Sequence, residues 1–216
     1  VYDAGIPSPA AGEIIEVNGR RGLIYEHIEG ISMLRDMNTR PWTMFKHARS
    51  LADLHVKINK QSISGLPSYK DGLRYAIGKT PQLTEDLREK ALAMLDVLPA
   101  GGQLRHGDYH PGNVILTKDG PIVIDWMTAR LGNSWADVAR TVMILSIGIK
   151  GAGKQVHPVV RMAVNLCRWI YLNRYHALFP DTKQELNGWL PVIAAARLNE
   201  DIAPEREALL KMVKES

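Results

Sequence analysis

The feature that most constrains this chain is the stretch over residues 104–126, a polar loop followed by two short apolar runs. The runs, rich in β-branched side chains, cover residues 113–117 and 121–125, with Lys-Asp-Gly at residues 118–120 between them. Glycine accepts a positive φ, which tight turns between strands require. The sequence therefore predicts a β-hairpin here, entered through a polar loop.

Three polar residues, Asp108, Asn113 and Asp125, stand at the ends of these runs. Side chains at the mouth of a rigid hairpin are held in place yet face solvent or a ligand. In one interpretation Asp108 is a base or orienting group for a hydroxyl, while Asn113 and Asp125 share a Mg²⁺ ion. Mg²⁺ prefers hard oxygen ligands, several of them from phosphate and water. Phosphoryl transfer needs little more than such positioning and charge neutralisation.

Two other interpretations use the same residues. His106, Asp108 and His110 alternate along an extended segment and so share one face, which suits a transition metal and metal-dependent phosphoester hydrolysis. In the other, Asp108 and Asn113 cap local turns and Asp125 only ends a strand. The residue types and their spacing leave these alternatives open.

The stretch resembles a known family. His-Gly-Asp-Tyr-His-Pro-Gly-Asn-Val-Ile over residues 106–115, followed by Ile-Asp-Trp over residues 124–126, is similar to the catalytic loop and metal-binding segment of aminoglycoside phosphotransferase and choline kinase-type enzymes, relatives of the protein kinases. The resemblance implies that Asp108 is the catalytic base and that Asn113 and Asp125 bind Mg²⁺. It also implies ATP as the phosphate donor.

The same resemblance implies supporting roles around the loop. His106 is expected to pack the loop rather than bind a metal, and Asp137 is expected to brace it. Asp137 also has the spacing of a capping box with Ser134, at the start of an expected helix, so both interpretations of Asp137 are structural. Ile115 and Ile124, on the hairpin, are expected to form an apolar floor under the nucleotide.

Near the N-terminus, residues 12–17 and 22–28 are expected to be strands, because Asn-Gly between apolar runs is a strong hairpin signal. Leu-Ile-Tyr-Glu-His-Ile-Glu-Gly over residues 23–30 resembles the hinge between the two lobes of the family. This resemblance implies that the backbone carbonyl of Glu26 and the backbone N–H of Ile28 bind adenine. The alternative is a plain hairpin that packs on a helical body.

The remaining sequence is mostly helical in its apolar spacing and capping signals, with Thr84 as one expected N-cap. Helices are expected at residues 32–37, 41–60, 71–77, 84–98, from residue 134, and at 157–179, 186–199 and 204–214.

We therefore predict an α+β, protein kinase-like fold with remnant small-lobe strands. A partial N-terminal lobe and hinge would cover residues 1–30. A mostly helical C-terminal lobe would cover residues 31–216 and carry the catalytic loop and β-hairpin.

Composition narrows the class of protein. The chain has 216 residues, of which 45% are hydrophobic and 23% charged, as in an ordinary globular protein. A net charge of +4 without a dense basic cluster does not suggest nucleic acid as a partner. The longest apolar run, near residues 141–149, is too short to span a bilayer, so no membrane role is expected. The single cysteine, Cys167, fits a reducing compartment, and we expect the cytoplasm.

Two features of the family do not occur in this sequence: a Gly-x-Gly-x-x-Gly turn, and a lysine in a strand before residue 20. The chain begins at Val1 without an initiator methionine, so we expect a fragment whose upstream part carries them. The alternative is a catalytically degenerate, kinase-like binding protein.

The expected acceptor is a small hydroxylated molecule such as an aminoglycoside, choline, an amino sugar or a homoserine-like compound. Glu200 and Asp201, with Glu205 nearby, are candidates to receive its amino groups; the alternative is that they are exposed acids near a helix start. Arg130 and Lys154 are candidate phosphate or acceptor contacts, although single basic residues in loops are mostly solvated.

Overall fold

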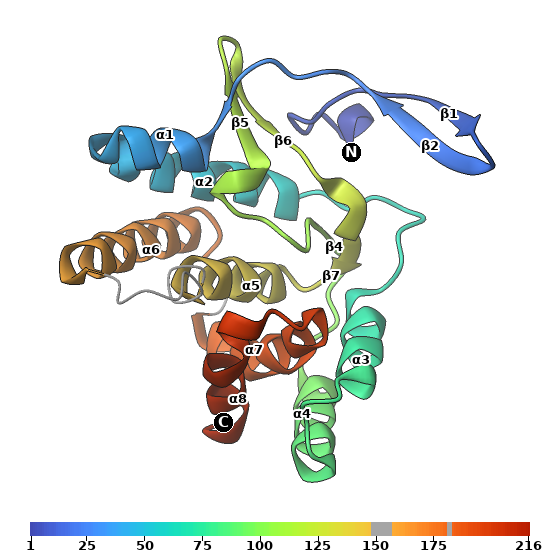
Figure 1. Cartoon of the computed structure of the whole chain (residues 1–216), viewed down its shortest axis with the longest axis vertical. Helices are drawn as coiled ribbons and strands as arrows, with labels where there is room; N and C mark the ends of the chain where they lie inside the picture. The colour runs from blue at the N-terminus through green and yellow to red at the C-terminus, as the bar shows by residue number, and fades with distance from the viewer. Residues whose placement is uncertain (148–156, 181–182) are drawn as a thin grey trace.

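The computed structural model describes residues 1–147, 157–180 and 183–216. It combines a helical body with short antiparallel strands, so the expected α+β class is confirmed (Figure 1). The strands are β1 (Ala11–Val17), β2 (Arg20–Tyr25), β3 (Ile31–Ser32), β4 (Gln103–Arg105), β5 (Val114–Thr117), β6 (Gly120–Val123) and β7 (Arg130–Gly132).

The helices lie close to their expected positions. They are α1 (Met33–Thr39), α2 (Met44–Asn59), α3 (Tyr69–Lys79), α4 (Glu85–Val97), α5 (Ser134–Ile147), α6 (Pro158–Leu178), α7 (Lys183–Arg197) and α8 (Arg206–Lys214). Short 3₁₀ turns are η1 (Tyr2–Ala4), η2 (Pro41–Thr43), η3 (Pro111–Asn113), η4 (Trp126–Thr128), η6 (Leu198–Glu200) and η7 (Ala203–Glu205).

The expected hairpin at the central stretch forms from β5 and β6. Thr117 pairs with Gly120 across the turn, and Gly120 has a φ of 126°, which a side chain would strain. β3 joins the other edge of β5 and completes a three-stranded sheet. β4 and β7 pair with each other, so the segment that holds the polar loop and the β5–β6 hairpin begins and ends at two paired strands.

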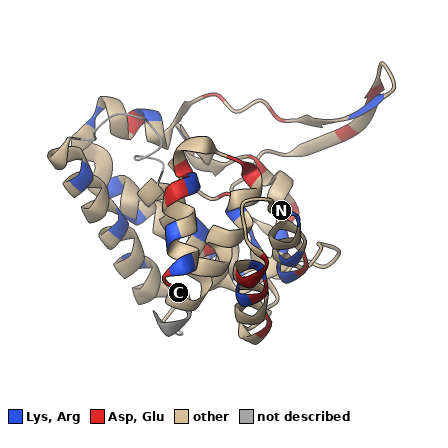
Figure 2. Cartoon of the chain, turned by 60° about the horizontal axis from the view of Figure 1, so that its bottom comes forward, with Lys and Arg blue, Asp and Glu red and all other residues tan. Residues whose placement is uncertain are grey.

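The β1–β2 hairpin projects away from the helical body, as Figures 1 and 2 show from two directions. Its turn residues Asn18 and Gly19 have φ values of 53° and 74°, the positive pair that suits the twist of a two-residue hairpin. Every residue of both strands is exposed. This element therefore owes its shape to its own turn and backbone pairing.

The segment before β1 lies across the β5–β6 hairpin. The backbone N–H of Val123 donates to the carbonyl of Pro7 at 2.7 Å, and the flanking side chains of Ile6 and Ser8 are buried. This contact holds the N-terminal strands next to the central stretch.

The core lies between the helices. α7 packs against α3, α4, α5 and α8, while α2 packs against α6. Along α2, Ala48, Leu51, His55 and Ile58 are buried at the three- and four-residue spacing of one helical face. Among the residues that the structure describes, no helix has the length and apolar character needed to cross a membrane.

The two expected helix caps have different outcomes. Thr84 is the N-cap residue of α4, as expected, but its side chain makes no capping hydrogen bond in the described structure. At α5, the cap comes from Asn133, whose side-chain oxygen accepts from the backbone N–H of Trp135 at 2.8 Å. Ser134 and Asp137 therefore do not form the capping box, because the carboxylate of Asp137 is engaged in the polar loop.

Candidate active site

The polar loop between β4 and η3 is fastened to the body by one buried carboxylate. Asp137 on α5 accepts the backbone N–H groups of His106 at 2.8 Å and Gly107 at 2.9 Å, and it contacts Nε2 of His55 at 3.0 Å. Burial alone would raise the pKa of Asp137. The charge of Arg105 and the hydrogen bond from His55 outweigh it and hold this pKa below the usual range. The loop is thus anchored by a charged group that stays ionised.

His106 is fully buried and uses both ring nitrogens within the protein. Nε2 lies 2.9 Å from the carbonyl oxygen of Ile124, and Nδ1 accepts the backbone N–H of Asp108 at 3.2 Å. A carbonyl only accepts, so Nε2 carries the proton, and burial lowers the pKa of the ring, which keeps it neutral.

This arrangement contradicts the transition-metal interpretation of His106, Asp108 and His110. With both nitrogens of His106 occupied, the ring has no lone pair to give to a metal. Within the described ranges, no group of three or more His, Cys, Asp or Glu side chains is placed to hold a metal ion. The metal-dependent phosphoesterase that depended on this site is therefore not supported.

Asp108 is half-buried, and donors from two elements face it. Nη2 of Arg140 on α5 lies 3.2 Å from Oδ1, and Nε2 of His110 lies 3.6 Å from Oδ2. Burial raises the pKa of this carboxyl, but the nearby imidazole of His110 and the charge of Arg140 outweigh that effect and hold the pKa well below its usual range. Asp108 is therefore ionised at neutral pH.

Asn113 and Asp125 come to the same end of the β5–β6 hairpin. The backbone carbonyl of Asn113 accepts the N–H of Ile124 at 3.0 Å, which brings the two chain segments side by side. The amide nitrogen of Asn113 donates to the carbonyl oxygen of Asp108 at 2.9 Å, so its amide oxygen is left outside these bonds. Asp125 follows directly, exposed and in the left-handed conformation at φ 63°.

A cavity of about 370 Å³ lies where the end of β2 meets the hairpin. The four residues expected to contact a nucleotide, Glu26, Ile28, Ile115 and Ile124, all line it, and so does Asp125. Two of these residues follow β2 and the other three belong to a hairpin that begins almost ninety positions later. The fold thus brings both groups to one cavity.

Both acids predicted to receive acceptor amino groups are already paired within the chain. Glu200 lies 2.7 Å from Nη1 of Arg140 and 3.0 Å from Nη1 of Arg197. Asp201 accepts from Arg206 at 2.7 Å. Their role toward an acceptor stays a prediction, and these contacts give it no support.

The remaining candidates lie elsewhere. Glu205 forms a buried bidentate pair with Arg197, at 2.6 and 3.0 Å. The guanidinium of Arg130 lies against α3, where a Cβ on Gly72 would come within 3.1 Å of its Nε. Lys154 falls outside the described residues.

The sequence interpretation missed three side chains that fasten the loop to the rest of the protein. Tyr109 is buried and donates to the carbonyl of Leu51 at 2.8 Å, while Thr141 donates to the carbonyl of Tyr109 at 2.8 Å. Thr128 donates to the carbonyl of His106 at 2.8 Å.

Arg140 was also missed, although a signal existed. It lies three residues after Asp137, so both project from the same face of α5 toward the loop. Because Asp137 was expected to brace the loop, the spacing indicates that Arg140, about one helical turn later, also lies near it.

The family model described as the phosphotransferase enzyme family matches residues 1–152. A search among curated proteins gave no match.

Several solved structures are similar over nearly the whole chain. Aminoglycoside-3'-phosphotransferase of type VIII has a TM-score of 0.62 at 20% identity, covering 93% of this chain and 76% of that chain. The apo form of a thermostable mutant of aminoglycoside phosphotransferase APH(4)-Ia has a TM-score of 0.66 at 16% identity, covering 98% and 78%. Amicoumacin kinase hAmiN, in complex with AMP-PNP, Ca²⁺ and Ami, has a TM-score of 0.64 at 12% identity, covering 99% and 73%.

At these identities the structures establish the fold, which is the protein kinase-like fold of aminoglycoside phosphotransferases, as the sequence predicted. The family match rests on the sequence itself and includes the polar loop, the hairpin and the start of α5. Because it covers 152 of the 216 residues, this chain belongs to the phosphotransferase enzyme family.

Proposed function

We propose that this protein transfers the γ-phosphate of ATP to a hydroxyl group of a small molecule. The observation that carries the proposal is the shared cavity: residues after β2 and residues of the hairpin line it together, and it reaches Asp125. Its volume of about 370 Å³ falls in the range of small-molecule sites. Family membership supports the same class of reaction.

In this proposal the cavity holds the base of the nucleotide. The backbone carbonyl of Glu26 and the backbone N–H of Ile28 would bind adenine, and the side chains of Ile115 and Ile124 would pack against the ring. The apolar side chains supply contact area for the base. The backbone hydrogen bonds fix its orientation, and they do not depend on the side chains of the residues that make them.

Asn113 and Asp125 would hold Mg²⁺. The donor set fits the ion, because Asp125 offers an exposed carboxylate at the cavity and the amide of Asn113 turns its nitrogen toward Asp108, which leaves its oxygen for a cation. When bound, Mg²⁺ supplies charge neutralisation of the phosphate oxygens. The complex of amicoumacin kinase hAmiN with AMP-PNP and Ca²⁺ supports the use of a nucleotide and a divalent cation.

Asp108 would orient the acceptor hydroxyl and take its proton as the new bond to phosphorus forms. Its lowered pKa makes it a weak base, so positioning is the larger part of its role. The amide of Asn113 donates to the backbone carbonyl of Asp108 at 2.9 Å, which fixes this part of the loop. A weak base suffices because the acceptor proton becomes acidic only late in a loose phosphoryl transfer.

We further propose that residues 1–30 are the end of a smaller N-terminal lobe with its hinge, and that residues 31–216 form the larger lobe. A cytoplasmic location is part of the same proposal, in keeping with a single buried cysteine, Cys167. The acceptor class stays open among aminoglycosides, amino sugars, choline and homoserine-like compounds.

The test is a phosphorylation screen with the full natural protein, ATP and Mg²⁺ against aminoglycosides, glucosamine, choline and homoserine. ADP release together with an acceptor mass increased by one phosphate is the expected result. Asp108→Asn should abolish it, whereas Asp119→Asn, which makes the same change in the exposed hairpin turn, should not. Nucleotide binding in a thermal-shift assay without transfer to any acceptor would favour a binding protein instead.

A further inference from the structure

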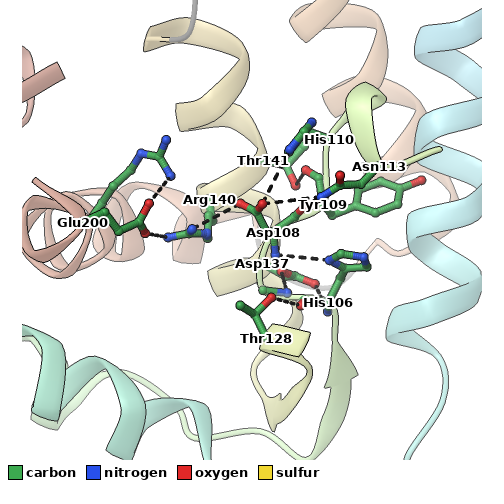
Figure 3. Close-up of polar contacts among 12 residues, drawn as sticks. His106, Asp108, Tyr109, His110, Asn113, Thr128, Asp137, Arg140, Thr141 and Glu200 are labelled. Carbon is green, nitrogen blue, oxygen red and sulfur yellow. Dashed lines mark hydrogen bonds and ion pairs between the residues drawn. The ribbon is translucent and has the colours of Figure 1, made fainter. Parts of the chain in front are cut away.

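Arg140 bridges two acidic residues that come from opposite sides of the site (Figure 3). Its Nη2 lies 3.2 Å from Oδ1 of Asp108, in the loop, and its Nη1 lies 2.7 Å from Oε1 of Glu200, in η6. Only 13% of the Arg140 side chain is exposed. A guanidinium is planar and its two terminal nitrogens are fixed relative to each other, so one end cannot shift without moving the other.

Glu200 is itself held from behind. Its second carboxylate oxygen lies 3.0 Å from Nη1 of Arg197, at the end of α7. Arg197 is in turn fixed by the buried carboxylate of Glu205. Ion pairs thus connect Asp108 in the loop to the helical body through Arg140, Glu200 and Arg197, with charges of alternating sign.

The other donors to Asp108 are weaker. His110 lies 3.6 Å and the amide of Asn113 lies 3.4 Å from Oδ2, both beyond the usual hydrogen-bond distance. Arg140 gives Oδ1 its closest side-chain donor and the one that is always charged. Rotation of the carboxylate is therefore limited mainly by a residue from α5.

We propose that Arg140 is the positioning residue of Asp108, and that Glu200 serves the site by holding Arg140 rather than by receiving an amino group of the acceptor. The proposal rests on the proposed function, since Asp108 is the catalytic group there. It follows from the bridging geometry: a carboxylate at Glu200 that balances Arg140 holds Nη1 of the guanidinium away from Asp108, so that Nη2 pairs with Oδ1 and Oδ2 stays outside this contact.

The first experiment measures the pairing without any substrate. Asp108→Asn, Arg140→Met and the double variant are unfolded in urea. If the pair is real, the midpoint of the double variant shifts by less than the sum of the two single shifts. Strictly additive shifts would overturn the proposal, whether or not an acceptor has been found.

The second experiment measures turnover with the acceptor identified by the screen. Arg140→Met should lower kcat by roughly 10- to 100-fold, with the KM for ATP within about threefold of wild type, because the base and not the nucleotide loses its placement. Arg140→Lys should recover part of the loss, since an ammonium keeps the charge but cannot bridge both acids. Glu200→Gln should lower kcat in the same way by a smaller factor.

A matched control separates positioning from stability. Arg174→Met removes an arginine from a distant ion pair with Asp53, at 2.7 Å, and should leave kcat unchanged. A wild-type kcat in Arg140→Met, or a rise in the acceptor KM alone for Glu200→Gln, would overturn the proposal. Failure of the wild type to phosphorylate anything would instead refute the proposed function, and the urea experiment would then decide the pairing by itself.

Discussion

The polar loop over residues 106–110 and the β1–β2 hairpin are both short segments, yet they are held in opposite ways. In the loop, groups from α2, α5 and η4 satisfy the backbone of His106 and Gly107 and the side chain of Tyr109. In the hairpin, the two strands pair with each other through their backbone groups, and every residue of both strands is exposed.

This difference between the loop and the hairpin shows that rigidity in this chain comes from buried, paired groups. A loop whose backbone N–H groups bind a buried carboxylate cannot change shape without leaving that charge unmatched, and an unmatched buried charge is costly. A hairpin held by its own turn and ladder is marginal by itself, because three or more strands or a packed face are needed for independent stability. The loop is therefore suited to hold reacting groups.

The largest expected effect concerns activity. Asp125→Asn should lower kcat at least about 1,000-fold, because it removes the proposed charged metal ligand. Asparagine accepts the left-handed conformation of this position, at φ 63°, so folding should be preserved. Steady-state kinetics and urea unfolding measure the two properties separately. Near-wild-type turnover would mean that the cation lies elsewhere.

The next effect concerns the anchor of the loop. Asp137→Asn should reduce the free energy of unfolding by about 3–5 kcal/mol, because a buried ion pair loses one partner and Arg105 is left uncompensated. Urea unfolding gives the value. A loss below about 1 kcal/mol would show that the loop does not depend on this charge.

A smaller effect is expected where the loop turns. Gly107 has a φ of 81°, and a Cβ there would come within 2.6 Å of the carbonyl oxygen of Thr128. Gly107→Ala should therefore cost about 2–3 kcal/mol of unfolding free energy. Gly65→Ala is the matched control, since Gly65 has a φ of 88° with nothing within 4 Å, and it should cost only about 1 kcal/mol. Equal losses of unfolding free energy in the two variants would mean that the contact between the new Cβ and Thr128 adds no destabilisation.

The anchor also predicts a dependence on pH. The folded-state pKa of Asp137 lies below its ordinary value of 3.8, so its contribution to stability is fully present above that pH and is lost as the pH falls below it. Unfolding of the wild type and of Asp137→Asn, followed from pH 6 downward, should therefore give curves that converge in acid. Parallel curves would contradict a lowered pKa.

The smallest effect is expected in the hairpin. The side chain of Ile14 is 72% exposed, so Ile14→Thr, which keeps a β-branched residue, should change the free energy of unfolding by less than about 0.5 kcal/mol. Urea unfolding of the full natural protein measures it. A loss above about 1.5 kcal/mol would reveal that this face is packed in the full protein, and the contrast with the loop would then be weaker.

Local chemistry was enough to predict several elements. The Asn-Gly and Lys-Asp-Gly turns gave both hairpins, because only a few residue types accept the positive φ values that they require. Apolar spacing located the helices to within a few residues. The loop sequence gave the family and the candidates Asp108, Asn113 and Asp125.

Local chemistry failed where two uses of one residue competed. Asp137 has the spacing of a cap, but its carboxylate binds the loop, because α5 begins beside β4 in space and thirty residues away in sequence. Spacing alone does not predict whether a carboxylate accepts from the backbone N–H groups of its own helix or from those of a loop that packs beside it.

The sequence by itself determined the hairpins, the helical body and the identity of the loop, since these depend on residues close together along the chain. Tertiary structure alone decided that Glu26 and Ile124 share one cavity and that Arg140 stands between Asp108 and Glu200. The physical reason is that a buried charge takes its partner from whichever element packs beside it. That element is chosen by the packing of the whole core, not by local sequence.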